Sequence, residues 1–153
     1  MNKCYAPYPL KENKMAEVSD YYKIISTEGN VLNTSLEKFW SDEVIEKFGG
    51  EIQEIFTKAV KSFEGKRFIL LANWSESPIL GKKAVTHLTE SMKIFKENNG
   101  YKVVEVVPAG NVKVGLRNAA ANAGEDDFRV VVNDLETAWK EVRRLQQELL
   151  NAE

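Results

Sequence analysis

Hydrophobic and polar positions along the chain follow two periods, which predict strands alternating with helices. Residues 68–72 are almost continuously apolar and bounded by polar residues, a pattern typical of a strand buried on both faces of a sheet. Segments 21–27 and 31–39 have strand character, and the glycine-containing segment 28–30 between them predicts a β-hairpin. Two further strands are predicted at 101–107 and 128–132.

Apolar residues at helical spacing predict about four helices. Ser41 caps the first, and the pair Gly49-Gly50 inside it predicts a bend or break, because each Gly costs about 1 kcal/mol relative to Ala. The second is expected to begin with Ser77 as N-cap and Pro78 at the first helical position. Asn133, with a glutamate three residues later, predicts the start of the last helix. The helices are expected at about 41–63, 78–98, 112–123 and from 134 onward.

This order of elements predicts a single α/β domain with a mixed sheet of about five strands and about four flanking helices. The opening hairpin requires one antiparallel pair, whereas strands that alternate with helices imply right-handed crossovers and parallel pairing. Residues 1–18 contain two prolines and no period, so we expect a flexible N-terminal arm before a domain over 19–153.

Composition and charge restrict the function classes. The 21 basic residues against 23 acidic ones give a net charge of −2, without the basic surface that nucleic-acid binding requires. The single cysteine, Cys4, allows no internal disulfide and fits a reducing compartment. The sequence shows neither an apolar run of the roughly 20 residues that span a bilayer nor a signal peptide, so we expect a cytoplasmic protein without membrane insertion.

Residues 20–150 resemble the SpoIIAA-like, or STAS, domains, and in particular the STAS/Sec14-type branch of bacterial proteins. The resemblance rests on the opening hairpin, the long first helix, the central strand FILLANW and the closing segment FRVVVNDLETAWKEV. It implies an α/β fold and a regulatory role in which the domain binds a protein partner or itself.

The resemblance also bears on a phosphoserine switch. Anti-sigma-factor antagonists of this fold carry a phosphorylatable serine at the start of the helix after the central strand. The matching stretch here is 76–81, and Pro78 stands where the modified serine is expected, while Asn73 replaces the expected Asp. We therefore expect no such switch, and the Ser77 hydroxyl is explained as a helix cap.

Candidate catalytic chemistry is sparse. His87 is the only histidine and borders the buried face of its helix, which favours a structural or surface role. The adjacent acids 125–127 point in different directions, unlike the spaced ligands of an oxygen-rich metal site. The segment 110–115 lacks the Lys-Ser/Thr ending of a phosphate loop. We expect no enzyme activity, metal or cofactor; an enzyme using His87 or the acidic turn would require both beside one cleft.

A binding surface is expected where the parallel strands end, because open α/β sheets bind ligands at their carboxyl edge. Two hypotheses remain open. One is a protein-interaction surface around Trp74 and the helix from Pro78; the other is a pocket for a small apolar ligand or lipid, suggested by the aromatics Trp40, Phe56, Phe63 and Trp74. Trp74 could instead only cap the core. The candidate binding residues are Asn73, Trp74, Ser75, Ser77, Asn111 and Asn133.

Overall fold

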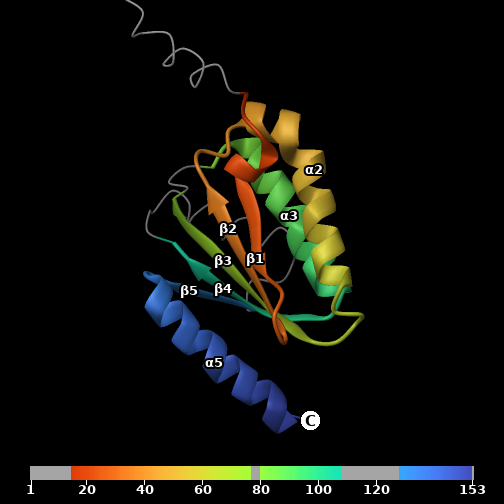
Figure 1. Cartoon of the computed structure of the whole chain (residues 1–153), viewed down its shortest axis with the longest axis vertical. Coiled ribbons are helices and arrows are strands. Elements are labelled where there is room, and N and C mark those ends of the chain that lie inside the picture. Colours follow the sequence, from red (N-terminus) through yellow and green to blue (C-terminus); the bar gives the residue numbers. More distant parts are fainter. Residues whose placement is uncertain (1–14, 77–79, 108–127, 153) are drawn as a thin grey trace, which may run out of the picture.

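The computed structural model describes residues 15–76, 80–107 and 128–152, and a mixed five-stranded sheet forms its centre (Figure 1). The strands lie side by side in sequence order; β1 and β2 pair antiparallel, and β2 to β5 are parallel. The predicted hairpin and the mixed sheet are therefore confirmed. The strands are β1 (Tyr22–Ser26), β2 (Val31–Glu37), β3 (Phe68–Glu76), β4 (Gly100–Val106) and β5 (Arg129–Val132).

Helices cover both faces of this sheet, as expected for an α/β fold. The helices α2 (Asp42–Lys61) and α3 (Lys82–Glu97) lie together on one face, and α5 (Leu135–Ala152) lies on the other (Figure 1). A short 3-10 helix, η2 (Val18–Asp20), precedes β1. The helix expected at 112–123 lies outside the described residues, as do Cys4 and most of the expected N-terminal arm.

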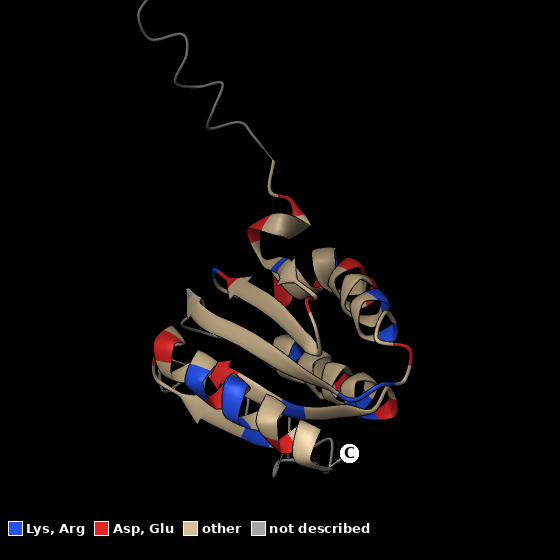
Figure 2. Ribbon diagram, turned by 60° about the horizontal axis from the view of Figure 1, so that its bottom comes forward, with Lys and Arg blue, Asp and Glu red and all other residues tan. Residues whose placement is uncertain are grey.

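Each face of the sheet has its own buried cluster. Residues of β2 alternate between them, so that Leu32 and Leu36 pack towards α2 and α3 while Val31 packs towards α5. Along α5, acidic and basic residues alternate on the solvent side, whereas the sheet carries few charges (Figure 2). None of the helices in the described part of the chain is long and apolar enough to cross a membrane.

Helix α2 begins as predicted but does not break at its glycines. The Ser41 hydroxyl accepts a hydrogen bond from the Val44 N–H at 3.2 Å, and the helix continues through Gly49 and Gly50 to Lys61. A Cβ atom on Gly49 would lie only 3.0 Å from Cγ2 of Ile45 in the same helix, and at an ordinary contact distance of 3.5 Å from the His87 ring of α3. Crowding by Ile45 within α2 thus disfavours a side chain at Gly49, and burial of the amphipathic face outweighs the propensity cost.

The strand predicted at 68–72 is longer than expected, because β3 continues to Glu76. Pairing with β2 holds the extension in place: Ser35 pairs with Asn73, and Glu37 pairs with Glu76. Hydrogen bonding to the neighbouring strand β2 thus keeps residues 73–76 in the sheet, although most of them are polar.

The predicted start of α3 is also wrong. Its N-cap is Gly81, whereas Ser77 and Pro78 lie outside the described residues. The cap is built with help from α2, since Asp42 Oδ1 accepts a hydrogen bond from the Lys83 N–H at 2.9 Å. A contact between residues 41 positions apart cannot be read from local spacing.

The cap of α5 lies one residue later than predicted. Asp134 Oδ1 accepts a hydrogen bond from the Thr137 N–H at 2.8 Å, so Asp134 rather than Asn133 closes the first turn. Asn133 is exposed just before the helix, which leaves its amide available to solvent.

Candidate functional site

The carboxyl ends of the parallel strands meet at one edge of the sheet. The register aligns Asn73 of β3 with Val106 of β4, and Val106 with Val132 of β5. Asn73 and Asn133 therefore lie at the same edge, separated by β4. Asn73 is half-buried and its Oδ1 accepts a hydrogen bond from the Ser75 N–H at 3.0 Å, while Ser75 is exposed.

Trp74 faces away from this edge surface and into the molecule. Its side chain is 1% exposed, and its ring centroid lies 5.2 Å from that of Trp40 in an edge-to-face arrangement. Of the two interpretations, the structure thus places Trp74 inside the core rather than on the surface. The remaining candidates, Ser77 and Asn111, lie outside the described residues.

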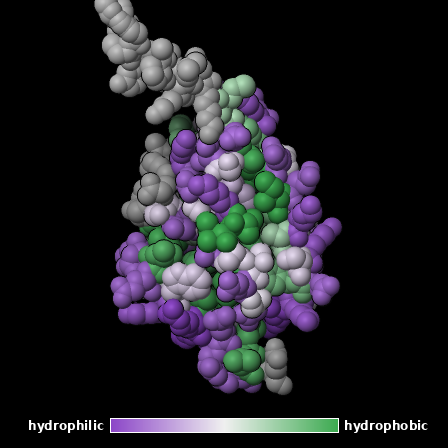
Figure 3. Space-filling view, in the orientation of Figure 1, coloured by the Kyte–Doolittle hydropathy of each residue, from purple (hydrophilic) through white to green (hydrophobic). Residues whose placement is uncertain are grey.

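An exposed aromatic that sequence reasoning missed lies at the same edge. Phe39 is 47% exposed and directly precedes Trp40, whose backbone bridges to Leu80 just beyond the end of β3. The exposure of Phe39 could have been expected from the sequence, because this residue lies beyond the alternating apolar and polar pattern that predicts the strand. Apolar residues elsewhere reach the surface among hydrophilic ones (Figure 3).

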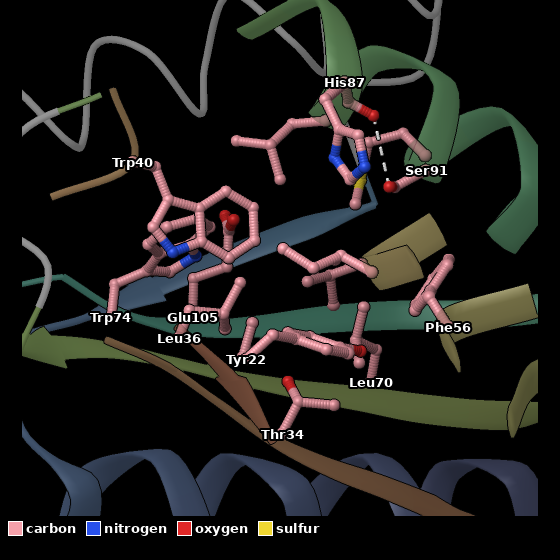
Figure 4. Close-up of a pocket in the computed structure, with 15 residues that line it drawn as sticks. Tyr22, Thr34, Leu36, Trp40, Phe56, Leu70, Trp74, His87, Ser91 and Glu105 are labelled. Atoms are coloured by element: carbon pink, nitrogen blue, oxygen red, sulfur yellow. Dashed lines mark hydrogen bonds between the residues drawn. The ribbon is translucent and has the colours of Figure 1, made fainter. Parts of the chain in front are cut away.

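Between the sheet and the helices α2 and α3 lies a cavity that Trp74 helps to form (Figure 4). It offers about 40 Å³ to the centre of a water molecule. Aromatic rings make up much of its wall, joined by aliphatic side chains such as Leu36, Leu88 and Met92. The aromatic residues are Tyr22, Trp40, Phe56, Trp74 and His87.

Several polar atoms in this region are buried without a hydrogen-bond partner among the described residues. Three of them belong to side chains that line the cavity: Tyr22 Oη, Trp74 Nε1 and His87 Nδ1. Burial raises the pKa of Tyr22, so its hydroxyl keeps its proton. Because most buried polar groups are paired in native proteins, three such atoms around one cavity call for an explanation.

The hydrogen bonding of His87 determines which of its nitrogens carries the proton. His87 Nε2 lies 2.9 Å from the carbonyl oxygen of Gly49, and a carbonyl can only accept, so Nε2 donates. Burial lowers the pKa of His87, which favours the neutral ring. Nδ1 of the neutral ring is then an acceptor, and Trp40 packs edge-on against the ring at 6.1 Å.

A buried ion pair borders the same region. Glu105, near the carboxyl end of β4, is 2% exposed, and its Oε1 accepts a hydrogen bond from Arg129 Nε at 2.5 Å. Burial raises the pKa of Glu105, and the Arg129 guanidinium acts in the opposite direction. Sequence reasoning missed this pair, although a lone acid in the apolar run from Val103 to Val107 signals it.

The described residues contain no group of three His, Cys, Asp or Glu side chains placed to hold a metal ion. The acidic turn at 125–127 lies outside them. His87 borders the buried face as predicted.

No family model matches the chain, and no curated protein matches it either. A solved structure does: that of an anti-sigma factor antagonist from Mycobacterium paratuberculosis, with a TM-score of 0.51. The chain has the fold of this antagonist.

The likeness covers 81% of this chain and 96% of the antagonist, at 18% sequence identity. The STAS-like α/β fold implied by the sequence resemblance is thereby confirmed. At this identity the likeness concerns the fold alone, since one fold hosts many functions.

Proposed function

We propose that the chain is a non-enzymatic regulatory module that binds a protein partner or a second copy of itself. One observation carries this proposal: the fold matches nearly the whole of a solved protein that is named an anti-sigma factor antagonist. The charge balance and the sparse catalytic groups support the same interpretation. A cytoplasmic location stays a prediction from composition.

The partner surface that we propose is the carboxyl-edge surface, defined by Phe39, Asn73, Ser75 and Asn133. It replaces Trp74, which is buried, with the exposed ring of Phe39. Phenylalanine is enriched in the cores of protein interfaces, and neutral amides and hydroxyls suit a polar rim. Ser77 and Asn111 stay candidates for the same surface from their positions in the sequence.

We further propose that this module works without the phosphoserine switch of the family that it resembles. Support comes from the sequence, since Pro78 stands where the modified serine is expected and Asn73 replaces an acid. Intact-mass measurement of protein purified from its own cells tests this point. A stoichiometric increase of one phosphate, located at Ser77, would contradict it.

Affinity capture with matched surface variants tests the interaction role. Phe39→Ala removes an exposed ring at the carboxyl edge, whereas Ile25→Ala removes an exposed apolar side chain from the edge strand β1. We expect Phe39→Ala to abolish recovery of a specific partner, or self-association, while Ile25→Ala retains it. Equal recovery with both variants would show that the carboxyl-edge surface is the wrong one.

A further inference from the structure

We propose that the cavity beneath α2 and α3 is a binding site for a small, uncharged aromatic or heteroaromatic molecule that carries both a hydrogen-bond donor and an acceptor. This inference does not depend on the protein-interaction proposal. It concerns the interior of the α2/α3 layer rather than the carboxyl-edge surface.

The wall of the cavity determines the shape and polarity of the occupant. Rings of Trp40, Trp74 and Phe56 surround it, and flat aromatic side chains pack well against another flat ring (Figure 4). Aliphatic side chains fill the spaces between them, as in most small-molecule sites. A planar and mainly apolar molecule therefore fits this wall better than a sugar or a phosphate.

The unpartnered atoms determine the hydrogen bonds that the occupant must make. Trp74 Nε1 can only donate, so it requires an acceptor on the ligand. His87 Nδ1 accepts, because Nε2 donates to Gly49, so it requires a donor. The Tyr22 hydroxyl can serve either way. A ligand with one donor and one acceptor thus satisfies atoms that the described protein leaves unpaired.

The charge of the occupant follows from the neighbouring residues. The buried carboxylate of Glu105 lines the cavity but is already paired with Arg129. An extra charge placed beside this pair would lose its hydration without gaining a counter-ion. An uncharged ligand avoids that loss.

The size of the cavity narrows the ligand-binding hypothesis raised from the sequence. A space of about 40 Å³ for water centres admits a small ring, whereas typical drug-sized pockets measure about 300 Å³ or more. A lipid chain does not fit this conformation. The cavity therefore suits a small ligand and not a lipid.

Pyrazole is a suitable probe because its small neutral ring carries adjacent donor and acceptor nitrogens. Thiophene is the matched control, since it has the same ring size without a strong donor or acceptor. The readout is the NMR signal of each tryptophan indole N–H in the whole protein. Trp74 faces the cavity, Trp40 Nε1 is already bonded to backbone carbonyls, and Trp139 lies on α5.

We expect pyrazole to produce a saturable shift of the Trp74 indole signal and to leave the Trp139 signal unchanged. Pyrazole should bind about 30-fold more tightly than thiophene, because each of its two neutral hydrogen bonds contributes a factor of about five. Trp74→Phe should weaken pyrazole binding by about fivefold, because it removes one of these two hydrogen bonds, and Trp139→Phe should not weaken it. If Trp74→Phe fails to fold, Tyr22→Phe serves as a smaller change in the same wall.

Three results would overturn the proposal. One is the absence of a saturable shift with pyrazole, which would assign the unpartnered atoms to bound water only. Another is equal affinity for pyrazole and thiophene, which would mean that the cavity accepts apolar molecules without using its polar atoms. The third is a shift confined to Trp139, which would place the ligand on α5.

Discussion

The two faces of the sheet are packed with different kinds of side chain. On the α5 face the buried residues are aliphatic, among them Val104, Leu71 and Leu145. On the α2/α3 face they include the tryptophans Trp40 and Trp74, and every ring–ring contact in the described part of the chain lies there.

Buried polar groups show the same division. The described atoms that are buried without a partner all belong to residues that point to the α2/α3 face, and so does the ion pair of Glu105 and Arg129. A face that only needed stability would avoid such groups, because each one costs free energy when it is buried. The comparison indicates that the α5 face is packed for stability, whereas the α2/α3 face contains the groups on which the proposed ligand site is built.

The largest expected effect comes from breaking the buried ion pair. Glu105→Ala leaves the Arg129 guanidinium buried without a counter-charge, and we expect a loss of about 3–5 kcal/mol in the free energy of unfolding. Urea unfolding followed by tryptophan fluorescence measures it.

The control for this prediction replaces both partners. The double variant Glu105→Leu with Arg129→Met should recover most of the lost stability, because it removes both charges at once. A single variant no less stable than the double variant would contradict the account of a coupled buried pair.

Added volume should distinguish the two faces. Ala72 lines the cavity, so Ala72→Val should change the free energy of unfolding by less than about 1 kcal/mol. Ala138 is 0% exposed in the α5 cluster, and Ala138→Val should cost about 1–3 kcal/mol by overpacking, of which about 0.6 is helix propensity. Equal costs in parallel urea titrations would show that the faces are packed alike.

A pH series isolates the contribution of His87. The unfolded chain takes up its histidine proton near pH 6.5, whereas burial keeps the folded ring neutral to lower pH. Stability should therefore fall as pH drops below about 6.5, by up to about 1.4 kcal/mol per pH unit, until the folded ring also protonates. Glu105, whose pKa is raised by burial, contributes with the opposite sign over its own range.

The contribution of His87 is therefore obtained by subtracting the free energy of unfolding of His87→Gln from that of the wild type at each pH. The contribution of Glu105 is the same in both proteins and cancels. Between pH 7 and 5 the wild type should lose stability more steeply than this variant. Parallel curves would mean that the folded ring protonates as easily as the unfolded one.

The smallest expected effect on the free energy of unfolding comes from removing a hydroxyl group on the α2/α3 face. Its size should depend on whether that hydroxyl has a hydrogen-bond partner. Tyr22 Oη has no partner in the described protein, so Tyr22→Phe should be neutral to within about 0.5 kcal/mol or slightly stabilising. Thr34 Oγ1 donates to the Leu71 carbonyl at 2.9 Å, and Thr34→Val should cost about 0.5–1.5 kcal/mol. A larger loss for Tyr22→Phe than for Thr34→Val would reveal a partner for the tyrosine.

The elements could be predicted from the sequence because their apolar periods are local. The hairpin at 22–37, the buried strand from Phe68 and the amphipathic α2 are examples. The predicted ends of helices and strands were wrong where a residue distant in the sequence determines them. Pairing with β2 extends β3, and Asp42 helps to cap α3.

The cavity was predictable only in part. Sequence reasoning proposed an aromatic pocket lined by Trp40, Phe56, Phe63 and Trp74. The structure places three of them in the cavity wall, whereas Phe63 stacks on Phe68. The Glu105–Arg129 pair joins residues 24 positions apart, and the unpartnered nitrogen of His87 depends on the carbonyl of Gly49. Such features arise from three-dimensional packing and have no local pattern.

A crystal structure determined under xenon pressure tests the difference between the two faces most directly, because xenon enters apolar cavities. The account predicts a xenon atom between the sheet and the helices α2 and α3, against Trp40, Phe56 and Met92, and none beneath α5. Xenon beneath α5, or none on the α2/α3 face, would contradict it.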